Sequence, residues 1–363
     1  MLHDTELANS ESLNWASRSE FWCDTSDAIL PKRKARERPD APLIICGNGM
    51  SLRVEDGALI IRDGFTHYQQ AQKVHRLFAG DRGNPTRIVV IDGSGTLTFS
   101  VLSWLADQRI ALIRIRWTGE VEVVAGGHGF SGDRAKIEWQ RRTRADDHAR
   151  IAFASDLIRR KFLACVETLA AFVPETKRRD DAERMHRGSI EKLRLQQISA
   201  VTDIRGLEGQ CAAQYFRAWE GMSLRWIGKR TVPPQWQQYG SRSSFAHSGM
   251  KPTNYAASHP INAMLNYGYA VKLAKIQVEA IASGYDPTIG IFHHGKKGNA
   301  AYAFDLIEPE RPKVDAAVLR FIAENTFAVA DFILTRNGVC RLSPQLARAI
   351  AALTIDRSVA PNI

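Results

Sequence analysis

The sequence contains no apolar run long enough to cross a membrane. Its most apolar segments, such as Ala349 to Leu353, are far shorter than the ~18–20 residues that a membrane-spanning helix requires. The N-terminal segment MLHDTELANSES also lacks a basic stretch followed by an apolar one, which is the pattern of a secretory signal. We therefore expect a cytoplasmic protein with no membrane contact.

Cysteine is scarce and scattered. The chain has five cysteines among 363 residues, and no two of them follow the CxxC spacing. This pattern excludes a zinc-binding cysteine cluster, and the odd number argues against a disulfide framework. We expect small buried side chains at Cys23, Cys46, Cys165, Cys211 and Cys340.

Acidic residues are absent from a long stretch of a basic chain. The formal net charge is +10, yet residues 221–278 contain no Asp or Glu. A second basic block lies at residues 134–150. Either block alone is typical of a solvated surface, but a carboxylate-free stretch leaves its cations available for phosphate groups. The charge distribution therefore favours a polyanionic partner.

The chain is long enough for two domains, since single cores rarely exceed about 250–300 residues. Residues 1–42 are polar and predict an N-terminal extension or a loosely packed arm. Residues 43–146 are β-rich, with one helix over residues 98–108, and residues 147–363 show helical periodicity. We expect an α+β protein in which a small β domain precedes a larger α-helical domain. Strands are predicted at residues 43–45, 58–61, 87–91, 111–113 and 121–124.

The first predicted helix of the second domain carries a lysine among its apolar positions. Lys161 shares the i, i+3, i+4 pattern with residues such as Phe162. Pro174 and the charged segment at residues 177–184 interrupt this pattern, and residues 225–258 predict a long polar loop. Further helices are predicted over residues 189–200, 208–219, 260–283, 314–334 and 344–353.

Three places in the helical half hold side chains that can ligate a metal. Glu208 opens a predicted helix, where a carboxylate is also typical of a residue that complements the helix dipole. His293 and His294 are adjacent, so an extended backbone lets only one of them face a given point. Asp305 and Glu308 fit either one side of a helical turn or a capping box. Two carboxylates and one imidazole form a ligand set for Mg²⁺ or Mn²⁺, and an acidic metal site in a basic domain suits phosphodiester chemistry.

Four motifs occur in a characteristic order. They are Glu208-Gly209 with Tyr215, NAMLNYGY at residues 262–269, GYDP at residues 284–287 before His293, and DLIEPERPKVD at residues 305–315. This series resembles the CRISPR-associated endonuclease/integrase family, the universal protein of spacer acquisition in antiviral defence. The resemblance is strong over residues 200–320 and weaker over the β-rich half.

The resemblance implies an N-terminal β-sandwich that helps to form a homodimer and a C-terminal helical catalytic domain. It implies that Glu208, His293 and Glu308 hold one Mg²⁺ or Mn²⁺ ion, with Asp305 close by as a supporting or alternate carboxylate. The adjacent His294 is expected to orient His293 or to cap the turn. Members of the family cleave DNA and join the 3′-hydroxyl ends of a double-stranded prespacer to the CRISPR repeat. They act with a small ferredoxin-like companion protein.

DNA contacts are expected from basic residues that flank these motifs. Arg242, Lys251 and Lys296 lie in a carboxylate-free context and are predicted to bind phosphates. Three aromatic residues of the long loop fit either stacking on DNA bases or anchoring of the loop. These are Trp226, Trp236 and Tyr239.

The NAMLNYGY helix is predicted to back the site. Asn262, Asn266 and Tyr267 are expected to pack and hydrogen-bond this helix. Its start departs from the family pattern, because His259 precedes Pro260 where the family often carries Asp. Proline suits the first turn, but histidine is a poorer N-cap than aspartate, so a weaker helix start is expected.

Two other functions fit part of the sequence. A transposase-like integrase of a mobile element would use the same catalytic domain, but we expect such a protein to carry an added DNA-binding helix-turn-helix. The segment from Leu342 to Ile363 predicts only one helix. A non-catalytic DNA-binding scaffold would have no need of the ligand set formed by Glu208, His293 and Glu308.

Overall fold

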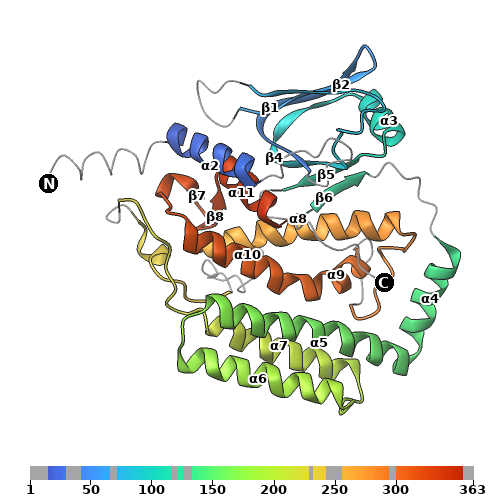
Figure 1. Cartoon of the computed structure of the whole chain (residues 1–363), viewed down its shortest axis with the longest axis vertical. Coiled ribbons are helices and arrows are strands. Elements are labelled where there is room, and N and C mark those ends of the chain that lie inside the picture. The colour runs from blue at the N-terminus through green and yellow to red at the C-terminus, as the bar shows by residue number, and fades with distance from the viewer. Residues whose placement is uncertain are drawn as a thin grey trace.

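The computed structural model describes residues 15–29, 42–65, 72–116, 121–125, 133–228, 232–242, 256–293 and 300–354. A sheet formed by the N-terminal half lies against one side of a larger helical region (Figure 1). The predicted α+β class and the order of its two parts along the chain are therefore confirmed.

The sheet has six strands in the order β3-β2-β1-β4-β5-β6. They are β1 (Leu43–Glu55), β2 (Ala58–Arg62), β3 (Val74–Leu77), β4 (Arg87–Leu97), β5 (Ala111–Ile115) and β6 (Val121–Ala125). β1 pairs antiparallel with β2 and parallel with β4, whereas β5 is parallel to β4 and antiparallel to β6. All five predicted strands are confirmed, and β3 is additional because its short polar sequence, VHRL, carries no strand pattern. The implied β-sandwich is not confirmed, since the described strands of this region form a single sheet.

The central strands are buried on both faces, which explains why they form continuous apolar runs in the sequence. Helix α3 (Phe99–Asp107) confirms the helix predicted over residues 98–108. In β4, Ile88 and Val90 join a core that is shared with α3. The alternate residues, Val89 and Ile91, join the core of the helical region. One face of the sheet is therefore covered by α3, and the other by the helices at residues 260–282 and 344–354 (Figure 1).

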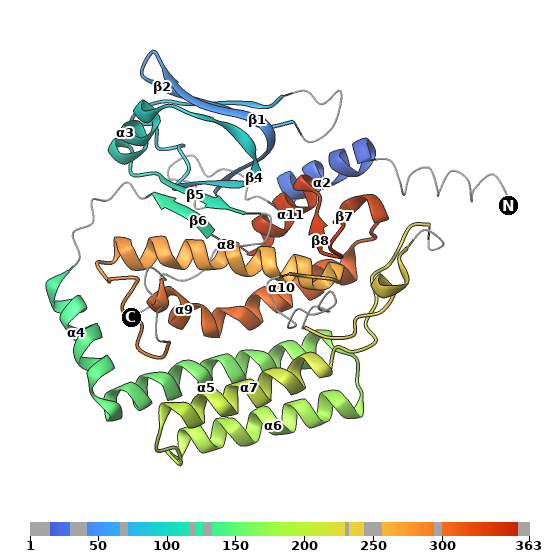
Figure 2. The ribbon, with the colours of Figure 1, turned by 180° about the vertical axis from the view of Figure 1, so that it is seen from behind.

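The helical region is arranged in layers below the sheet (Figure 2). Its helices are α4 (Arg134–Ala145), α5 (Asp147–Phe172), α6 (Lys177–Arg194), α7 (Val201–Arg217), α8 (Pro260–Ala282), α9 (Ala301–Ile307), α10 (Arg311–Glu324) and α11 (Pro344–Thr354). Helices α5, α6 and α7 form the outer layer, and α8 lies next to the sheet with α9 and α10 between (Figures 1 and 2). None of the described helices is long and apolar enough to cross a membrane.

Two basic segments that lack an apolar pattern are helical. Helix α6 runs through the charged residues 177–184, which the sequence predicts as an interruption. Thr176 caps its first turn, and Arg179 pairs with Glu183 one turn further on. Helix α4 is capped by Asp133, whose carboxylate accepts hydrogen bonds from two backbone N–H groups of the first turn. Local capping and ion pairs decide these helices, rather than hydrophobic periodicity.

The segment predicted as one helix over residues 314–334 contains a break. Helix α10 ends at Glu324, and the chain then forms a short turn and strand β7 (Phe332–Leu334), which pairs with β8 (Cys340–Leu342). Phe327 and Phe332 in this stretch are fully buried, so their apolar character reflects tertiary packing rather than helix continuation.

The N-terminal extension contains a packed helix, which the prediction of a loosely packed arm does not include. Helix α2 (Trp15–Ile29) lies beside α11 (Figure 1). Trp22 is fully buried against Phe321 and Phe327. Arg18 forms a bidentate pair with the buried Asp331, with both distances 2.8 Å. Trp22 and Arg18 thus anchor this helix on the helical region.

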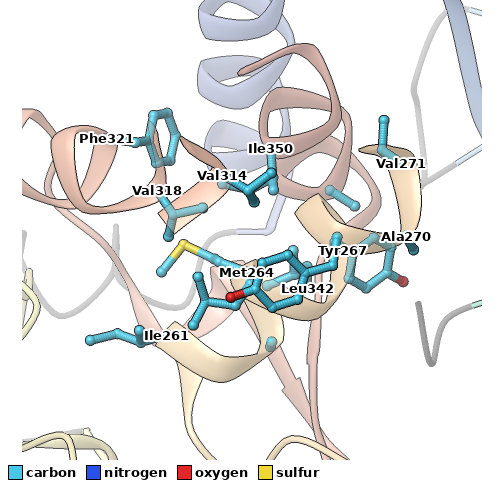
Figure 3. Close-up of a cluster of buried hydrophobic side chains, with 14 of the residues drawn as sticks. Ile261, Met264, Tyr267, Ala270, Val271, Val314, Val318, Phe321, Leu342 and Ile350 are labelled. Atoms are coloured by element: carbon cyan, nitrogen blue, oxygen red, sulfur yellow. The ribbon is translucent and has the colours of Figure 1, made fainter. Parts of the chain in front are cut away.

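Helix α8 runs through the centre of the molecule. Met264 and Tyr267 pack among Val314, Val318 and Ile350 of the neighbouring helices (Figure 3). Gly268 permits this close approach, because a Cβ there would lie 2.7 Å from Cγ1 of Val314 and 2.9 Å from Cγ2 of Thr354. The small residue between the two tyrosines of the NYGY motif is therefore a packing requirement.

The start of α8 is capped by the histidine that replaces the family aspartate. Nδ1 of His259 accepts a hydrogen bond from the backbone N–H of Ile261 at 3.2 Å. Burial lowers the pKa of His259 to about 4, so the ring is neutral at physiological pH and keeps the lone pair that it needs. The departure at this position therefore still supplies an N-cap.

Candidate active site

Lys161 lies between two of the predicted metal ligands. Its Nζ is 2.5 Å from Oε1 of Glu208 on α7 and 2.6 Å from Oε2 of Glu308. Glu308 opens the short 3-10 turn Glu308–Glu310 that joins α9 to α10, and Lys161 projects from α5. Three segments that are far apart in the sequence thus converge on one ammonium group.

Glu308 is bound by cations on both carboxylate oxygens. Its side chain is 7% exposed, against 27% for that of Glu208. While Lys161 contacts Oε2, Nε of Arg311 donates to Oε1 at 3.0 Å. Burial by itself would raise the pKa of Glu308, but Lys161 and Arg311 outweigh it and lower the pKa to about 2. The carboxylate is therefore ionised throughout the physiological range.

Lys161 is likewise held in its charged form. Burial acts to lower the pKa of its ammonium group, and the carboxylates of Glu308 and Glu208 raise it above its ordinary value. Arg311 is partly buried, with 29% of its side chain exposed, and its guanidinium lies over the ring of Tyr269 at 5.0 Å from the centroid. The site therefore contains two carboxylates and two permanent cations, of which Glu308 and Lys161 are buried.

Asp305 fixes the position of His293. It is fully buried on α9 and accepts backbone N–H groups of Ile291 at 2.5 Å, Phe292 at 3.0 Å and His293 at 2.7 Å. Nδ1 of the His293 ring lies 2.9 Å from Oδ1 of the same carboxylate. A carboxylate that binds Nδ1–H of a histidine leaves Nε2 as the basic nitrogen, which is the usual arrangement behind a metal-binding imidazole.

The loop that carries His293 is held by arginines from two helices. Nε of Arg150 on α5 donates to the carbonyl of Ile291 at 2.8 Å, and Arg205 on α7 donates to the carbonyl of Phe292 at 2.5 Å. Gly290 makes the turn possible, since a Cβ there would lie 2.5 Å from the carbonyl oxygen of His293. The loop is thus bound on its N–H side by Asp305 and on its carbonyl side by guanidinium groups.

Glu208 and Glu308 are linked through Lys161, which lies between the two carboxylates. His293 is close enough to Glu308 to contribute to the lowering of the pKa of that carboxyl. Among the residues that the structure describes, no three His, Cys, Asp or Glu side chains form a ready metal-binding group. Ligation by all three predicted ligands therefore requires Lys161 to leave the position between them.

The predicted DNA-contact residues are only partly described. His294, Lys251 and Lys296 lie outside the described residues. Arg242 packs inward: its guanidinium donates to Oδ1 of Asn266 at 2.7 Å and lies over the rings of Phe216 and Tyr269. An arginine engaged in this way contributes to packing next to the site, so the prediction that it contacts phosphate gains no support from its position.

The predicted backing residues are on α8 as expected. Asn262 is fully buried and donates to the carbonyl of Ser241 at 2.8 Å, while Asn266 binds Arg242. Tyr267 is buried in the core shown in Figure 3. The two asparagines therefore fasten the segment of residues 232–242 to α8.

The aromatic residues of the long loop serve as anchors. Trp236 and Tyr239 are each 1% exposed, and Trp226 stacks on Trp236 with ring centroids 6.3 Å apart. Trp236 and Tyr239 are therefore not available in this structure for stacking on DNA bases, and Trp226 is partly buried. Of the two roles that the sequence allows, the described residues fit loop anchoring.

Lys161 and Asp315 are the main residues that the sequence analysis does not assign to the site. Asp315 is fully enclosed and accepts a hydrogen bond from the hydroxyl of Tyr269. Burial raises the pKa of Asp315 to about 6 even though Tyr269 acts to lower it. The available signal for Lys161 was its position on the apolar face of a helix, where a lysine must find a carboxylate partner.

Comparisons with known proteins agree with the motif order. The family profile described as CRISPR associated protein Cas1 matches residues 43–354. The chain is 24% identical over 331 residues to the CRISPR-associated endonuclease Cas1 1 of Archaeoglobus fulgidus, and the alignment covers 87% of each protein.

Solved structures with the same architecture include a casposase and a bacterial Cas1. The casposase bound to its integration product matches with a TM-score of 0.70 and 25% identity, over 86% of this chain and 81% of the casposase. The Cas1 protein TM1797 from Thermotoga maritima shares the fold, with a TM-score of 0.60 and 17% identity over 83% of this chain and 84% of its own. Because the family profile spans both the sheet and the helical region, this chain belongs to the CRISPR-associated protein Cas1 family.

Proposed function

We propose that this chain is a metal-dependent DNA endonuclease and integrase of CRISPR adaptation. It would cleave DNA and join the 3′-hydroxyl ends of a prespacer to the CRISPR repeat by transesterification. The observation that carries this proposal is the convergence of Glu208 and Glu308 on one cation, next to a histidine oriented by Asp305, in a chain of this family.

The donor set fits a divalent ion of the Mg²⁺ or Mn²⁺ type. Glu208, Glu308 and Nε2 of His293 would hold it, and a positive group already occupies the space between the two carboxylates. Carboxylate oxygens suit both ions, and an imidazole ligand favours Mn²⁺. When bound, the ion supplies Lewis-acid activation of the scissile phosphate and of the attacking oxygen.

The residues of the chain would perform the remaining tasks. Asp305 keeps Nδ1 of His293 protonated and the ring in one orientation, so that Nε2 is available. Arg311 holds Oε1 of Glu308, which leaves Oε2 as the oxygen for the ion. No protein nucleophile is required, since a DNA 3′-hydroxyl attacks in strand transfer and water attacks in hydrolysis.

Double-stranded DNA is the partner that the charge distribution favours. The basic residues of α4 supply cations for phosphate binding, whereas Arg242, Lys272 and Lys275 of the carboxylate-free stretch are engaged within the protein. The related casposase is named as bound to its integration product, which supports DNA strand transfer as the activity of this fold. A homodimer and a small ferredoxin-like companion are proposed as partners because they accompany members of the family.

The same comparison favours a second candidate function. A casposase-like integrase would insert the ends of a mobile element, and the casposase matches this chain at 25% identity. The two functions share the catalytic site and differ in DNA target. Preference for a plasmid with a CRISPR leader and repeat would favour adaptation, and target-independent insertion would favour the mobile-element function.

The test is a strand-transfer assay with a labelled duplex that carries 3′-hydroxyl ends, a supercoiled plasmid with a CRISPR array, and the companion protein. Wild type and E308Q are compared with and without Mn²⁺. Metal-dependent joining that is absent from E308Q is expected. Cleavage without joining would support only the nuclease, and a folded protein that binds DNA but does neither would support the scaffold alternative.

A further inference from the structure

The ammonium group of Lys161 occupies the space in which a divalent ion would bridge Glu208 and Glu308. We propose that Lys161 is an internal counter-cation: it holds the two carboxylates together in the metal-free protein and must be displaced when the ion binds. This inference rests on the proposed function, because it assumes that these two glutamates are ligands. It assigns Lys161 a role as a positioning residue that sets the metal affinity of the site.

The geometry makes the two cations mutually exclusive. Nζ of Lys161 is 2.5 Å from Glu208 Oε1 and 2.6 Å from Glu308 Oε2, so the two oxygens can be no farther apart than the sum of these distances. A Mg²⁺-type ion binds oxygen at about 2.0–2.1 Å. Such an ion would need almost the same point as Nζ, and both positive groups cannot occupy it.

The charges show why a resident cation is needed. Glu208 and Glu308 come from different elements, and no backbone N–H group is recorded on either carboxylate among the described hydrogen bonds. Arg311 binds Oε1 of Glu308 and leaves the facing oxygens to Lys161. Without the ammonium group, two carboxylates would face each other in a poorly solvated site, which is strongly unfavourable.

Lys161 is suited to this role by its attachment. It projects from α5, whereas the carboxylates belong to α7 and the turn before α10, so it can withdraw without moving either ligand. Its four-carbon chain is flexible and its charge is compact, unlike the rigid fork of an arginine. Divalent-ion binding then competes with an intramolecular ion, and the apparent affinity for the ion is lower than the ligands alone would give.

The test measures Mn²⁺ binding by isothermal titration calorimetry on the full chain without DNA. We expect K161M and K161Q to bind Mn²⁺ at least tenfold more tightly than wild type, and to melt at a lower temperature without metal and recover when Mn²⁺ is added. K161R keeps the positive charge and is expected to stay near the wild-type affinity. Tighter Mn²⁺ binding is the result that removal of a merely structural lysine would not give. Weaker or unchanged Mn²⁺ binding in both K161M and K161Q would therefore overturn the proposal.

The matched control is K272M. Lys272 is buried to the same degree as Lys161 and pairs with Glu310 at 2.8 Å, two residues beyond Glu308. Its removal is expected to change the melting temperature but not the Mn²⁺ affinity; equal tightening in K272M would overturn the assignment to Lys161. E308Q distinguishes failure of the proposed metal site from failure of the proposed role of Lys161. If E308Q binds Mn²⁺ as wild type does, the metal site itself is wrong and both proposals fail; if E308Q loses binding and K161M gains none, only the role of Lys161 fails.

Discussion

Two buried carboxylate clusters in this molecule are stabilised in different ways. Between the sheet and α11, Asp63 pairs with Arg348, and its other oxygen accepts backbone N–H groups of Cys46 at 2.8 Å and Gly64 at 3.0 Å. In the helical region, Glu208 and Glu308 share Lys161 and bind side-chain cations only. The first cluster is permanently satisfied by the backbone, whereas the second depends on charges that can be exchanged.

The comparison gives a physical criterion for separating structural from functional buried charges. When backbone N–H groups donate hydrogen bonds to a carboxylate, the fold holds that carboxylate in place. Its oxygens are then not available to bind a ligand. A pair of carboxylates that relies on one flexible lysine retains its affinity for cations. By this criterion Asp305, which binds three backbone N–H groups and a histidine ring, belongs with Asp63 although it lies at the site.

The largest effect is expected from E308Q, which tests the exchangeable cluster directly. The neutral amide keeps the shape of the side chain but removes the charge that a divalent ion needs, so DNA cleavage and strand transfer should fall by at least about 100-fold. Gel assays with Mn²⁺ measure the loss. The matched control is E310Q, which alters the same 3-10 turn at a residue that pairs with Lys272 and Lys313, and near-wild-type activity is expected there.

The next effect concerns stability rather than activity. D63A removes the partner of Arg348 and leaves a guanidinium group buried without its carboxylate, which should reduce the free energy of unfolding by about 3–5 kcal/mol. Urea denaturation measures this change. At a temperature where the variant is folded, its Mn²⁺ affinity should equal that of wild type; a change in affinity would mean that the two clusters are not independent.

A smaller effect is expected from D305N, which tests whether a carboxylate bound by backbone N–H groups acts as a support rather than as a metal ligand. An amide in place of the carboxylate weakens the hold on Nδ1 of His293 and disturbs the backbone N–H groups of the loop, without removing a predicted ligand. Loss of a residue that orients a ligand typically weakens metal binding by about 10–100-fold. Titration calorimetry with Mn²⁺ measures this. A complete loss of binding would instead identify Asp305 as a ligand.

The smallest effect is the acid dependence of stability. The pKa of Glu308 is lowered from 4.5 to about 2 in the folded protein, so its ion pairs contribute stability above pH 4.5 that is lost as the pH falls toward 2. The free energy of unfolding of metal-free E308Q should therefore depend less on pH than that of wild type in this window. Denaturation curves at pH 5, 4 and 3 test this, and identical slopes would contradict the assigned ion pairs.

Much of the fold follows from local sequence patterns. The apolar runs 43–45, 87–91 and 111–113 form strands whose alternate residues are buried on the two faces of the sheet, and the runs 58–61 and 121–124 form strands nearer its edges. The helix from Pro260 begins as predicted. The charged first half of α6, helix α4 and strand β3 carry no apolar period and depend on caps, ion pairs and neighbours, so periodicity does not reveal them. The helix predicted over residues 189–200 covers only the end of α6, which stops at Arg194.

The candidate site, too, could be predicted from the sequence only in part. The motif order identifies Glu208, His293 and Glu308, and the spacing from Asp305 to Glu308 already suggests two carboxylates near one another. The inward packing of Arg242 could not be predicted, because it depends on Asn266 and Tyr269 of α8 and on Phe216 of α7. The sequence shows that Lys161 lies on an apolar helix face, but it does not show which carboxylates it binds.

The sequence by itself determined the family, the strand positions, the chemical types of the candidate ligands and the excess of positive charge, because each of these is carried by residues close together in the chain or by their order. Only the tertiary structure decided that Lys161, from α5, sits between carboxylates of α7 and the turn before α10. It also decided that Asp305 is saturated by donors while Glu308 is held by exchangeable cations. The contacts of Lys161 arise from helix packing between residues 47 and 147 positions apart in the chain, and no local pattern encodes which side chain will fill the space between two others.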